Sequence, residues 1–197
     1  MIGIIGASGS GKTTLLNLVL QFLESEDGQI KVDNQVLNKD NSGSFQKILG
    51  YVKQDVFIKD APMMENIAFD RHNIDKERVL KVIEEAYLSE FLAELPDGLN
   101  TMLGENGANL SGGQKQRIGI ARALYQDAEI LLFDEITSAL DTETEQAITE
   151  SIANLAKLHK TVIIVAHRIS TLRHCDRIYE LKDGAIVREV SYAELTV

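Results

Sequence analysis

A glycine-rich stretch near the start of the chain, Gly6-Ala7-Ser8-Gly9-Ser10-Gly11-Lys12-Thr13, is the feature that most constrains its fold. The stretch fits the pattern Gly-x-x-x-x-Gly-Lys-Ser/Thr, and it follows a β-type run and precedes a helical pattern, as the mechanism requires. Such a loop points successive amides at bound phosphates, the helix N-terminus adds positive potential, and Lys12 neutralises phosphate charge. The Thr13 hydroxyl would face Mg²⁺. A chance glycine-rich turn is the alternative, and the strand-loop-helix context argues against it.

Hydrophobic periodicity predicts strands and helices in alternation along the chain. Apolar runs predict strands at 2–5, 30–32, 48–52, 129–133 and 161–166, and helical spacing predicts helices at 14–23 and 143–158. The cluster of Asn, Asp, Ser and Gly at 38–44 predicts a loop. Alternation of this kind implies an α/β fold: a P-loop core whose mainly parallel sheet carries helices on both faces.

Two further segments depart from this alternation. From 61 to 125 the pattern is helical, with Val79, Val82, Ile83 and Ala86 on one face, so we predict an inserted helical subdomain. The chain is then a single domain, 1–197, with its core in about 1–60 and 126–197. Runs at 178–181 and 185–190 predict a terminal hairpin, followed by a capping box at Ser191 and Glu194.

Composition excludes several classes of protein. The net charge of −10 repels a nucleic-acid backbone, so nucleic acid is not an expected partner. A single cysteine, Cys175, rules out an internal disulfide, and the four histidines lack metal-ligand spacing. The longest apolar runs fall far below the roughly 18 residues of a membrane span, and the N-terminus lacks the features of a signal peptide.

Two adjacent carboxylates follow the apolar run Ile130-Leu131-Leu132-Phe133. A strand of this kind places Asp134 and Glu135 at the carboxyl edge of the sheet, where ligands bind. We expect Asp134 to hold Mg²⁺ through water and Glu135, which has no duty to the metal, to act as general base toward water. A solvated acidic strand end is the alternative.

A third motif, Leu110-Ser111-Gly112-Gly113-Gln114, puts a serine and two glycines at a predicted helix start. This is a second anion-binding terminus with no phosphate in its own chain, so it needs a partner. The motif resembles the signature of the ATP-binding-cassette family, in which the loop contacts the γ-phosphate bound by the opposing subunit. The resemblance covers the whole chain and implies an ATPase that works as a head-to-tail pair, homodimeric or heterodimeric.

The resemblance also implies roles for single residues. Gln54 resembles the glutamine that reaches Mg²⁺ and relays to a transmembrane partner, Asp141 lies in a segment (138–141) that crosses the dimer seam, and His167 resembles the switch histidine at the γ-phosphate. The implied catalytic residues are Lys12, Glu135 and His167, and the implied Mg²⁺ residues are Thr13, Gln54 and Asp134. The implied ATP contacts are Gly6, Ala7, Ser8, Gly9, Ser10, Gly11, Lys12, Thr13, Thr14, Gln54, Leu110, Ser111, Gly112, Gly113, Gln114 and Asp141.

Two segments resemble exporters or flippases rather than importers. One is 61–69, and the other is 103–107, whose Glu105 would contact intracellular loops of a membrane domain. Only five residues precede Gly6, whereas the family carries a β-lobe there with an aromatic side chain that stacks on adenine. The resemblance therefore implies an N-terminally truncated chain with an incomplete antiparallel β-subdomain, a transmembrane domain upstream in the same polypeptide, and a location at the cytoplasmic face of a plasma or inner membrane.

Two positions depart from the family pattern, and other classes of P-loop protein fit the sequence less well. Asp127-Ala128 replaces Asp-Pro and Ile136 replaces Ala, but neither position touches a reacting atom. A DNA-maintenance ATPase would carry a long heptad-rich insertion, and 14–110 is short and lacks one. A ribosome-acting member would carry two cassettes, and a P-loop kinase would have no use for a signature loop. The transported substrate is not encoded in this segment.

Overall fold

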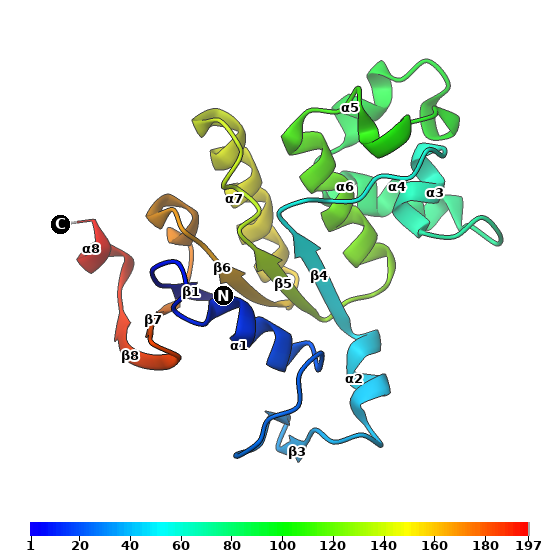
Figure 1. Cartoon of the computed structure of the whole chain (residues 1–197). Coiled ribbons are helices and arrows are strands. Elements are labelled where there is room, and N and C mark those ends of the chain that lie inside the picture. The colour runs from blue at the N-terminus through cyan, green and yellow to red at the C-terminus, as the bar shows by residue number, and fades with distance from the viewer. Residues whose placement is uncertain (197) are drawn as a thin grey trace.

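A six-stranded sheet with the order β4-β5-β6-β1-β7-β8 runs through the computed structural model, which describes residues 1–196 (Figure 1). The strands are β1 (Ile2–Ile5), β4 (Leu49–Lys53), β5 (Ile130–Asp134), β6 (Thr161–Val165), β7 (Arg177–Lys182) and β8 (Ala185–Val190). The first five pair in parallel, and β8 pairs antiparallel with β7. The predicted α/β class with a mainly parallel sheet is confirmed.

Alternating side chains along each strand divide the core between the two faces of the sheet. In β5, Leu131 and Phe133 pack into the cluster that also contains Ile148 of α7 (Thr142–Lys157), whereas Leu132 packs into the cluster with Leu16 of α1 (Lys12–Val19). Because strand side chains point to opposite faces in turn, a continuous apolar strand requires cover on both sides. Helices on both faces supply that cover.

The helices α3 (Met63–Ala68), α4 (Lys76–Glu85) and α5 (Ser89–Glu94) lie together beyond the β4 edge of the sheet (Figure 1). The apolar positions that predicted α4 are buried, with Val79, Val82 and Ile83 each 3% exposed or less. Helix α6 (Gly112–Tyr125) packs against both this group and β4, so one helix joins the group to the sheet. In the described part of the chain, no helix combines the length and apolar character needed to span a membrane.

The first helix is shorter than predicted. Periodicity predicts 14–23, whereas α1 ends at Val19 in a Schellman motif, with the Phe22 N–H bonded to the Asn17 carbonyl at 2.8 Å and the Gln21 N–H to the Leu18 carbonyl at 3.1 Å. Gln21 takes the left-handed conformation, with φ 59°, at the position where glycine is usual. Phe22 consequently leaves the helical face and is 62% exposed.

The segment between α1 and β4 also differs from the prediction. The expected strand at 30–32 is β2 (Lys31–Val32), which pairs with β3 (Gln35–Val36) in a separate two-stranded antiparallel sheet. The predicted loop at 38–44 contains the start of a short helix, α2 (Ser42–Lys47), that Phe45 anchors in the core. Local polar composition misses this helix because a single buried aromatic, rather than periodicity, holds it.

The C-terminal segment follows the prediction. Strands β7 and β8 form the expected hairpin, and Asp183 and Gly184 both have positive φ, 50° and 78°, as a tight two-residue turn requires. Ser191 and Glu194 form a reciprocal capping box at the start of α8 (Tyr192–Leu195).

The close approach of β4 to α6 yields a stability prediction. A Cβ on Gly50 would lie 2.7 Å from the Ala123 Cβ and 2.8 Å from the Ala128 Cβ, and neither methyl group can rotate away. We expect Gly50→Ala to lower the free energy of unfolding by about 1–3 kcal/mol, as overpacking does. Urea denaturation measures the change. Gly43→Ala, where a Cβ meets open space in α2, is the matched control and should be neutral or stabilising; equal effects at the two positions would contradict the packing explanation.

Candidate functional site

The glycine-rich loop lies between β1 and α1, and two of its backbone carbonyls hold its lysine in place. The Lys12 Nζ donates to the Gly6 carbonyl at 2.9 Å and to the Ala7 carbonyl at 3.0 Å. Lys12 is only 5% exposed, yet an ammonium group has three donors, so one N–H is left for an anion. Gly11 precedes the helix with φ 102°, a conformation that glycine adopts without strain, and α1 starts at Lys12 directly behind it.

Parallel pairing brings two further predicted residues to the same edge of the sheet. β6 lies between β1 and β5, and the Ala166 N–H bonds to the Ile4 carbonyl at 3.1 Å while the Glu135 N–H bonds to the Val165 carbonyl at 2.9 Å. His167 therefore stands between the loop strand and the acidic strand end. The His167 Nε2 lies 2.8 Å from a Glu135 carboxylate oxygen. Two residues that are 32 positions apart in sequence thus come into direct polar contact.

Asp134 ends β5 in register with Lys53 of β4 and Val165 of β6. Its carboxylate accepts a hydrogen bond of 2.9 Å from the Tyr51 hydroxyl, a contact that sequence patterns did not predict. Partial burial, together with the hydrogen bond and the negative charge of Asp134, raises the pKa of Tyr51 well above its usual value. The phenol therefore remains protonated and keeps donating to Asp134.

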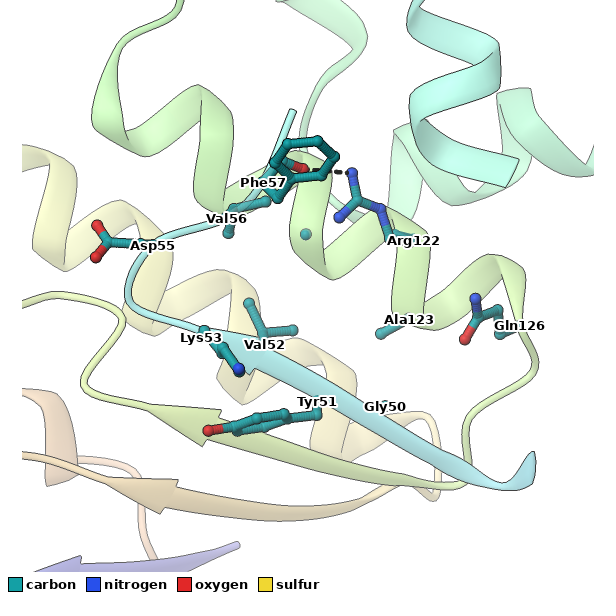
Figure 2. Close-up of a pocket in the computed structure, with 11 residues that line it drawn as sticks. Gly50, Tyr51, Val52, Lys53, Asp55, Val56, Phe57, Arg122, Ala123 and Gln126 are labelled. Atoms are coloured by element: carbon teal, nitrogen blue, oxygen red, sulfur yellow. Dashed lines mark hydrogen bonds between the residues drawn. The ribbon is translucent and has the colours of Figure 1, made fainter. Parts of the chain in front are cut away.

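Gln54 follows β4 directly, at the same sheet edge, with an exposed side chain. Its backbone carbonyl accepts a hydrogen bond from the Gln116 side chain of α6, and Gln116 is buried. A groove of about 200 Å³ adjoins this segment (Figure 2) and is lined in part by Lys53, Phe57 and Arg122. Phe57 is 59% exposed, and burial lowers the pKa of Arg122 to about 10.

The signature-like motif begins α6 as predicted. Ser111 is the N-cap: its Oγ accepts from the Gln114 N–H at 3.2 Å, and its own N–H donates to the Gln114 side-chain oxygen at 2.8 Å. The two glycines lie against the chain just after the acidic strand. A Cβ on Gly112 would be 2.8 Å from a Leu140 methyl carbon, and one on Gly113 would be 2.5 Å from a Thr144 methyl carbon.

Asp141, which the family resemblance places among the ATP contacts, caps α7 in this structure. It accepts from the Thr144 N–H at 3.0 Å and from the Thr144 hydroxyl at 2.7 Å, and the backbone hydrogen bond from Thr144 lowers its pKa. Within one chain, the contacts of the Asp141 side chain are explained by its role as the N-cap of α7. A contact with nucleotide across a pair stays a prediction.

Several polar residues that sequence analysis did not single out surround this site. They are Tyr51, Gln116, Arg168 and Glu145. Arg168 is adjacent to His167 and could have been noticed for that reason, but Glu145 looks like a solvated acidic residue in the first turn of a helix and turns out to be buried. The remaining histidines, His72, His159 and His174, are exposed. No group of three or more His, Cys, Asp or Glu within residues 1–196 is arranged to hold a metal.

The mainly parallel sheet, with a phosphate loop and an acidic strand end at one edge, defines a phosphate-loop nucleotide-binding domain. Comparison with known proteins gives its family. The family model described as "ABC transporter" matches residues 1–138. The chain is 45% identical over 194 residues to an ATP-dependent lipid A-core flippase from Polaromonas sp. and 40% identical over 198 residues to one from Cupriavidus metallidurans, covering 98% and 99% of this chain and 33% of each relative. It therefore belongs to the ABC transporter family, which binds and hydrolyses ATP.

A solved structure agrees with this assignment. The chain superposes on a bacterial Atm1-family ABC exporter with ATP bound with a TM-score of 0.86 and 39% sequence identity, over 98% of this chain and 34% of that protein. The chain thus spans about a third of the length of the relatives it matches, and it is homologous to the nucleotide-binding domain of ABC exporters.

The contact between Tyr51 and Asp134 predicts how stability depends on alkaline pH. Because the folded pKa of Tyr51 lies above its unfolded value of about 10, the folded state keeps a proton that the unfolded state loses, so this stability is present below that pH and is lost as pH rises. Above about pH 10, the unfolding free energy of Tyr51→Phe should therefore fall less steeply than that of the wild type, by up to about 1.4 kcal/mol per pH unit. Urea unfolding at several alkaline pH values measures both slopes. Tyr87→Phe, at an exposed tyrosine, should follow the wild type, and equal slopes for Tyr51→Phe and wild type would refute the prediction.

Proposed function

We propose that this chain binds Mg-ATP and hydrolyses it in a head-to-tail pair, and that hydrolysis powers transport of a substrate across a membrane by an exporter. The observation that carries the proposal is the 2.8 Å contact of Glu135 with His167 at the sheet edge where the Lys12 loop also ends. The single domain would divide into a core at about 1–60 and 126–197 and a helical subdomain at about 61–125.

Phosphate binding is assigned to the loop and the first turn of α1. Lys12 presents its remaining N–H at the helix start, and the exposed residues Ala7, Ser8 and Gly9 leave backbone amides of the loop accessible. The helix N-terminus favours a negatively charged group at this end. Thr13 and Thr14 are both exposed on the same turn.

The residues near this turn fit a magnesium ion by their chemistry. Asp134 offers a carboxylate that is already oriented by Tyr51, Thr13 offers an exposed hydroxyl, and Gln54 offers an exposed amide oxygen. Oxygen donors of this kind, few in number and supplemented by water and phosphate, suit Mg²⁺. When bound, Mg²⁺ would neutralise phosphate charge. Asp134 would hold it through water, with Thr13 and Gln54 as the other protein groups.

Glu135 and His167 are assigned to the chemical step. The His167 Nε2 contacts one carboxylate oxygen of Glu135. The other carboxylate oxygen would be able to accept a proton from water. Glu135 would act as general base, and His167, on the strand beside β1, would stabilise charge on the transferred phosphoryl group together with Lys12. The pair would hold the base in one orientation.

The second helix start supports a composite site between two subunits. Ser111 presents the N-terminus of α6, a 14-residue helix, beside the 138–141 segment rather than beside the Lys12 loop. A head-to-tail pair would bring Ser111 and Gln114 of one copy to the phosphates held by the other. Either an identical chain or a close relative would serve as the partner.

A transmembrane partner would engage the groove beside Gln54. The groove combines an exposed aromatic side chain, Phe57, with the cations Lys53 and Arg122, and Gln116 ties the Gln54 backbone to α6. Glu105 is exposed in the short helix at Glu105–Gly107 and would provide a second contact. With such a partner, the chain would lie at the cytoplasmic face of a plasma or inner membrane, coupled to a transmembrane domain N-terminal to it.

Lys12 and Glu135 should fail in different ways in the full-length protein. Lys12→Ala should lose ATP binding, whereas Glu135→Gln should bind ATP but lower kcat by about 10²–10⁴-fold, because the amide cannot accept the proton. Light scattering with Mg-ATP should show a stable dimer only for Glu135→Gln. Glu150→Gln, an exposed position on α7, is the matched control and should behave as wild type. Hydrolysis by Glu135→Gln at the parental rate would remove the general-base assignment.

The composite site predicts complementation between two inactive variants. Ser111→Arg should leave ATP binding nearly intact and abolish hydrolysis, because the bulky cation replaces the cap at the helix start that faces the partner's phosphates. Mixing Ser111→Arg with Lys12→Ala should restore one complete site per heterodimer and part of the hydrolysis. Absence of recovery, with heterodimers demonstrated by differential tagging, would argue against a shared site.

A further inference from the structure

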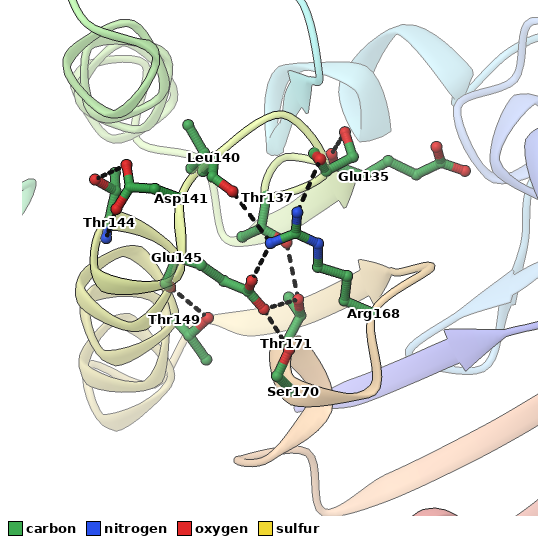
Figure 3. Close-up of polar contacts among 11 residues, drawn as sticks. Glu135, Thr137, Leu140, Asp141, Thr144, Glu145, Thr149, Arg168, Ser170 and Thr171 are labelled. Carbon is green, nitrogen blue, oxygen red and sulfur yellow. Dashed lines mark hydrogen bonds and ion pairs between the residues drawn. The ribbon is translucent and has the colours of Figure 1, made fainter.

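Arg168, the residue after His167, donates hydrogen bonds to three acceptors (Figure 3). Its guanidinium donates to the Leu140 carbonyl at 3.1 Å, to the Ser138 carbonyl at 3.3 Å and to the Glu145 carboxylate. Two of these acceptors lie in the 138–141 segment and the third lies on α7. A planar guanidinium reaches these acceptors from two separate nitrogens, whereas the single nitrogen of a lysine cannot reproduce that fork.

Glu145 is a buried charge, only 4% exposed, and its other contacts come from the same short helix that follows His167. Ser170 and Thr171 both donate to its carboxylate, the latter with an O–O distance of 3.3 Å. Burial acts to raise the pKa of Glu145, but the hydrogen bonds from Ser170 and Arg168 and the charge of Arg168 outweigh it and hold the pKa below its usual range. The Glu145 carboxylate is therefore charged, and it accepts hydrogen bonds from Arg168, Ser170 and Thr171.

The same contacts reach Glu135 through the chain that follows it. The Ser138 N–H and hydroxyl both donate to the Glu135 carbonyl, at 3.1 Å and 2.9 Å. The buried hydroxyls of Thr137 and Thr171 lie 2.8 Å apart and form a second tie between the 135–141 turn and the helix after His167. Figure 3 shows the Glu135 side chain pointing away from this network, so the network contacts its backbone and leaves its carboxylate to the site.

We propose that Arg168 and Glu145 form a clasp that holds His167 and Glu135 in register with the 138–141 segment, so that a displacement of this segment by a second subunit reaches both residues. The inference rests on the proposed function. Arg168 and Glu145 are positioning residues, because their side chains face the clasp rather than the reacting atoms. Leu140 also packs on Gly112 of the signature motif. The 138–141 segment therefore contacts both the start of α6 and, through Arg168, the chain that follows His167.

Conservative substitutions in the full-length protein test the clasp. Arg168→Lys keeps the charge but loses the fork, and we expect kcat to fall about tenfold or more while the Kd for ATP changes by less than about twofold, since small misplacements of catalytic groups are costly. Glu145→Gln should act in the same direction. The double variant should be no worse than the poorer single variant, because both remove one shared contact. Arg173→Lys, at an exposed arginine outside the network, is the matched control.

Hydrogen exchange supplies a readout that does not depend on activity. Arg168→Lys should raise amide exchange in 136–141 and in 168–172 together, with the protein still folded, whereas Arg173→Lys should change neither segment. Wild-type kcat in Arg168→Lys, a parallel fall of kcat, ATP affinity and melting temperature, or additive effects in the double variant would each overturn the clasp. A wild-type protein without ATP hydrolysis would instead refute the proposed function, and the exchange experiment would still decide the clasp.

Discussion

The parallel pairing of β1, β6 and β5 is the constraint on which the rest of the molecule depends. Parallel strands end at the same edge, so this pairing brings the phosphate loop, His167 and the two carboxylates that end β5 to one place. β6 lies in the middle, and it therefore determines that His167 meets Glu135 at 2.8 Å. The pairing in turn requires cover on both faces, because these strands carry apolar side chains on both faces, and α1, α6 and α7 provide it.

Three polar contacts then orient the groups at this edge. Tyr51 donates to Asp134 from the neighbouring strand, Gln116 fixes the backbone of Gln54 from α6, and Arg168 ties the chain after His167 to α7. Each contact links a residue at or next to the edge to a different neighbouring element. Rigid support of this kind suits a phosphoryl-transfer site, where the protein contributes position and electrostatics more than covalent chemistry.

Much of the fold and most candidate site positions follow from sequence because their signals are local. The strand-loop-helix around Lys12, the apolar strand before Asp134 and the capped helix after Ser111 each carry their pattern within a few residues. The predictions of secondary structure were wrong where the local sequence pattern does not match the local structure. α1 stops early at a left-handed Gln21 without a glycine, and α2 forms in a polar stretch around one buried Phe45.

The sequence by itself determined the class of fold, the phosphate loop, the acidic strand end, the signature-like helix start and, through them, the family of the chain. Only the tertiary structure decided which side chains support the site. Glu145 has the sequence context of a solvated helical residue, and it is buried because Arg168, Ser170 and Thr171 converge on it from another strand's loop. Strand order creates such contacts between residues that are distant in sequence, and periodicity within a segment records which face is apolar but not which strand lies beside it.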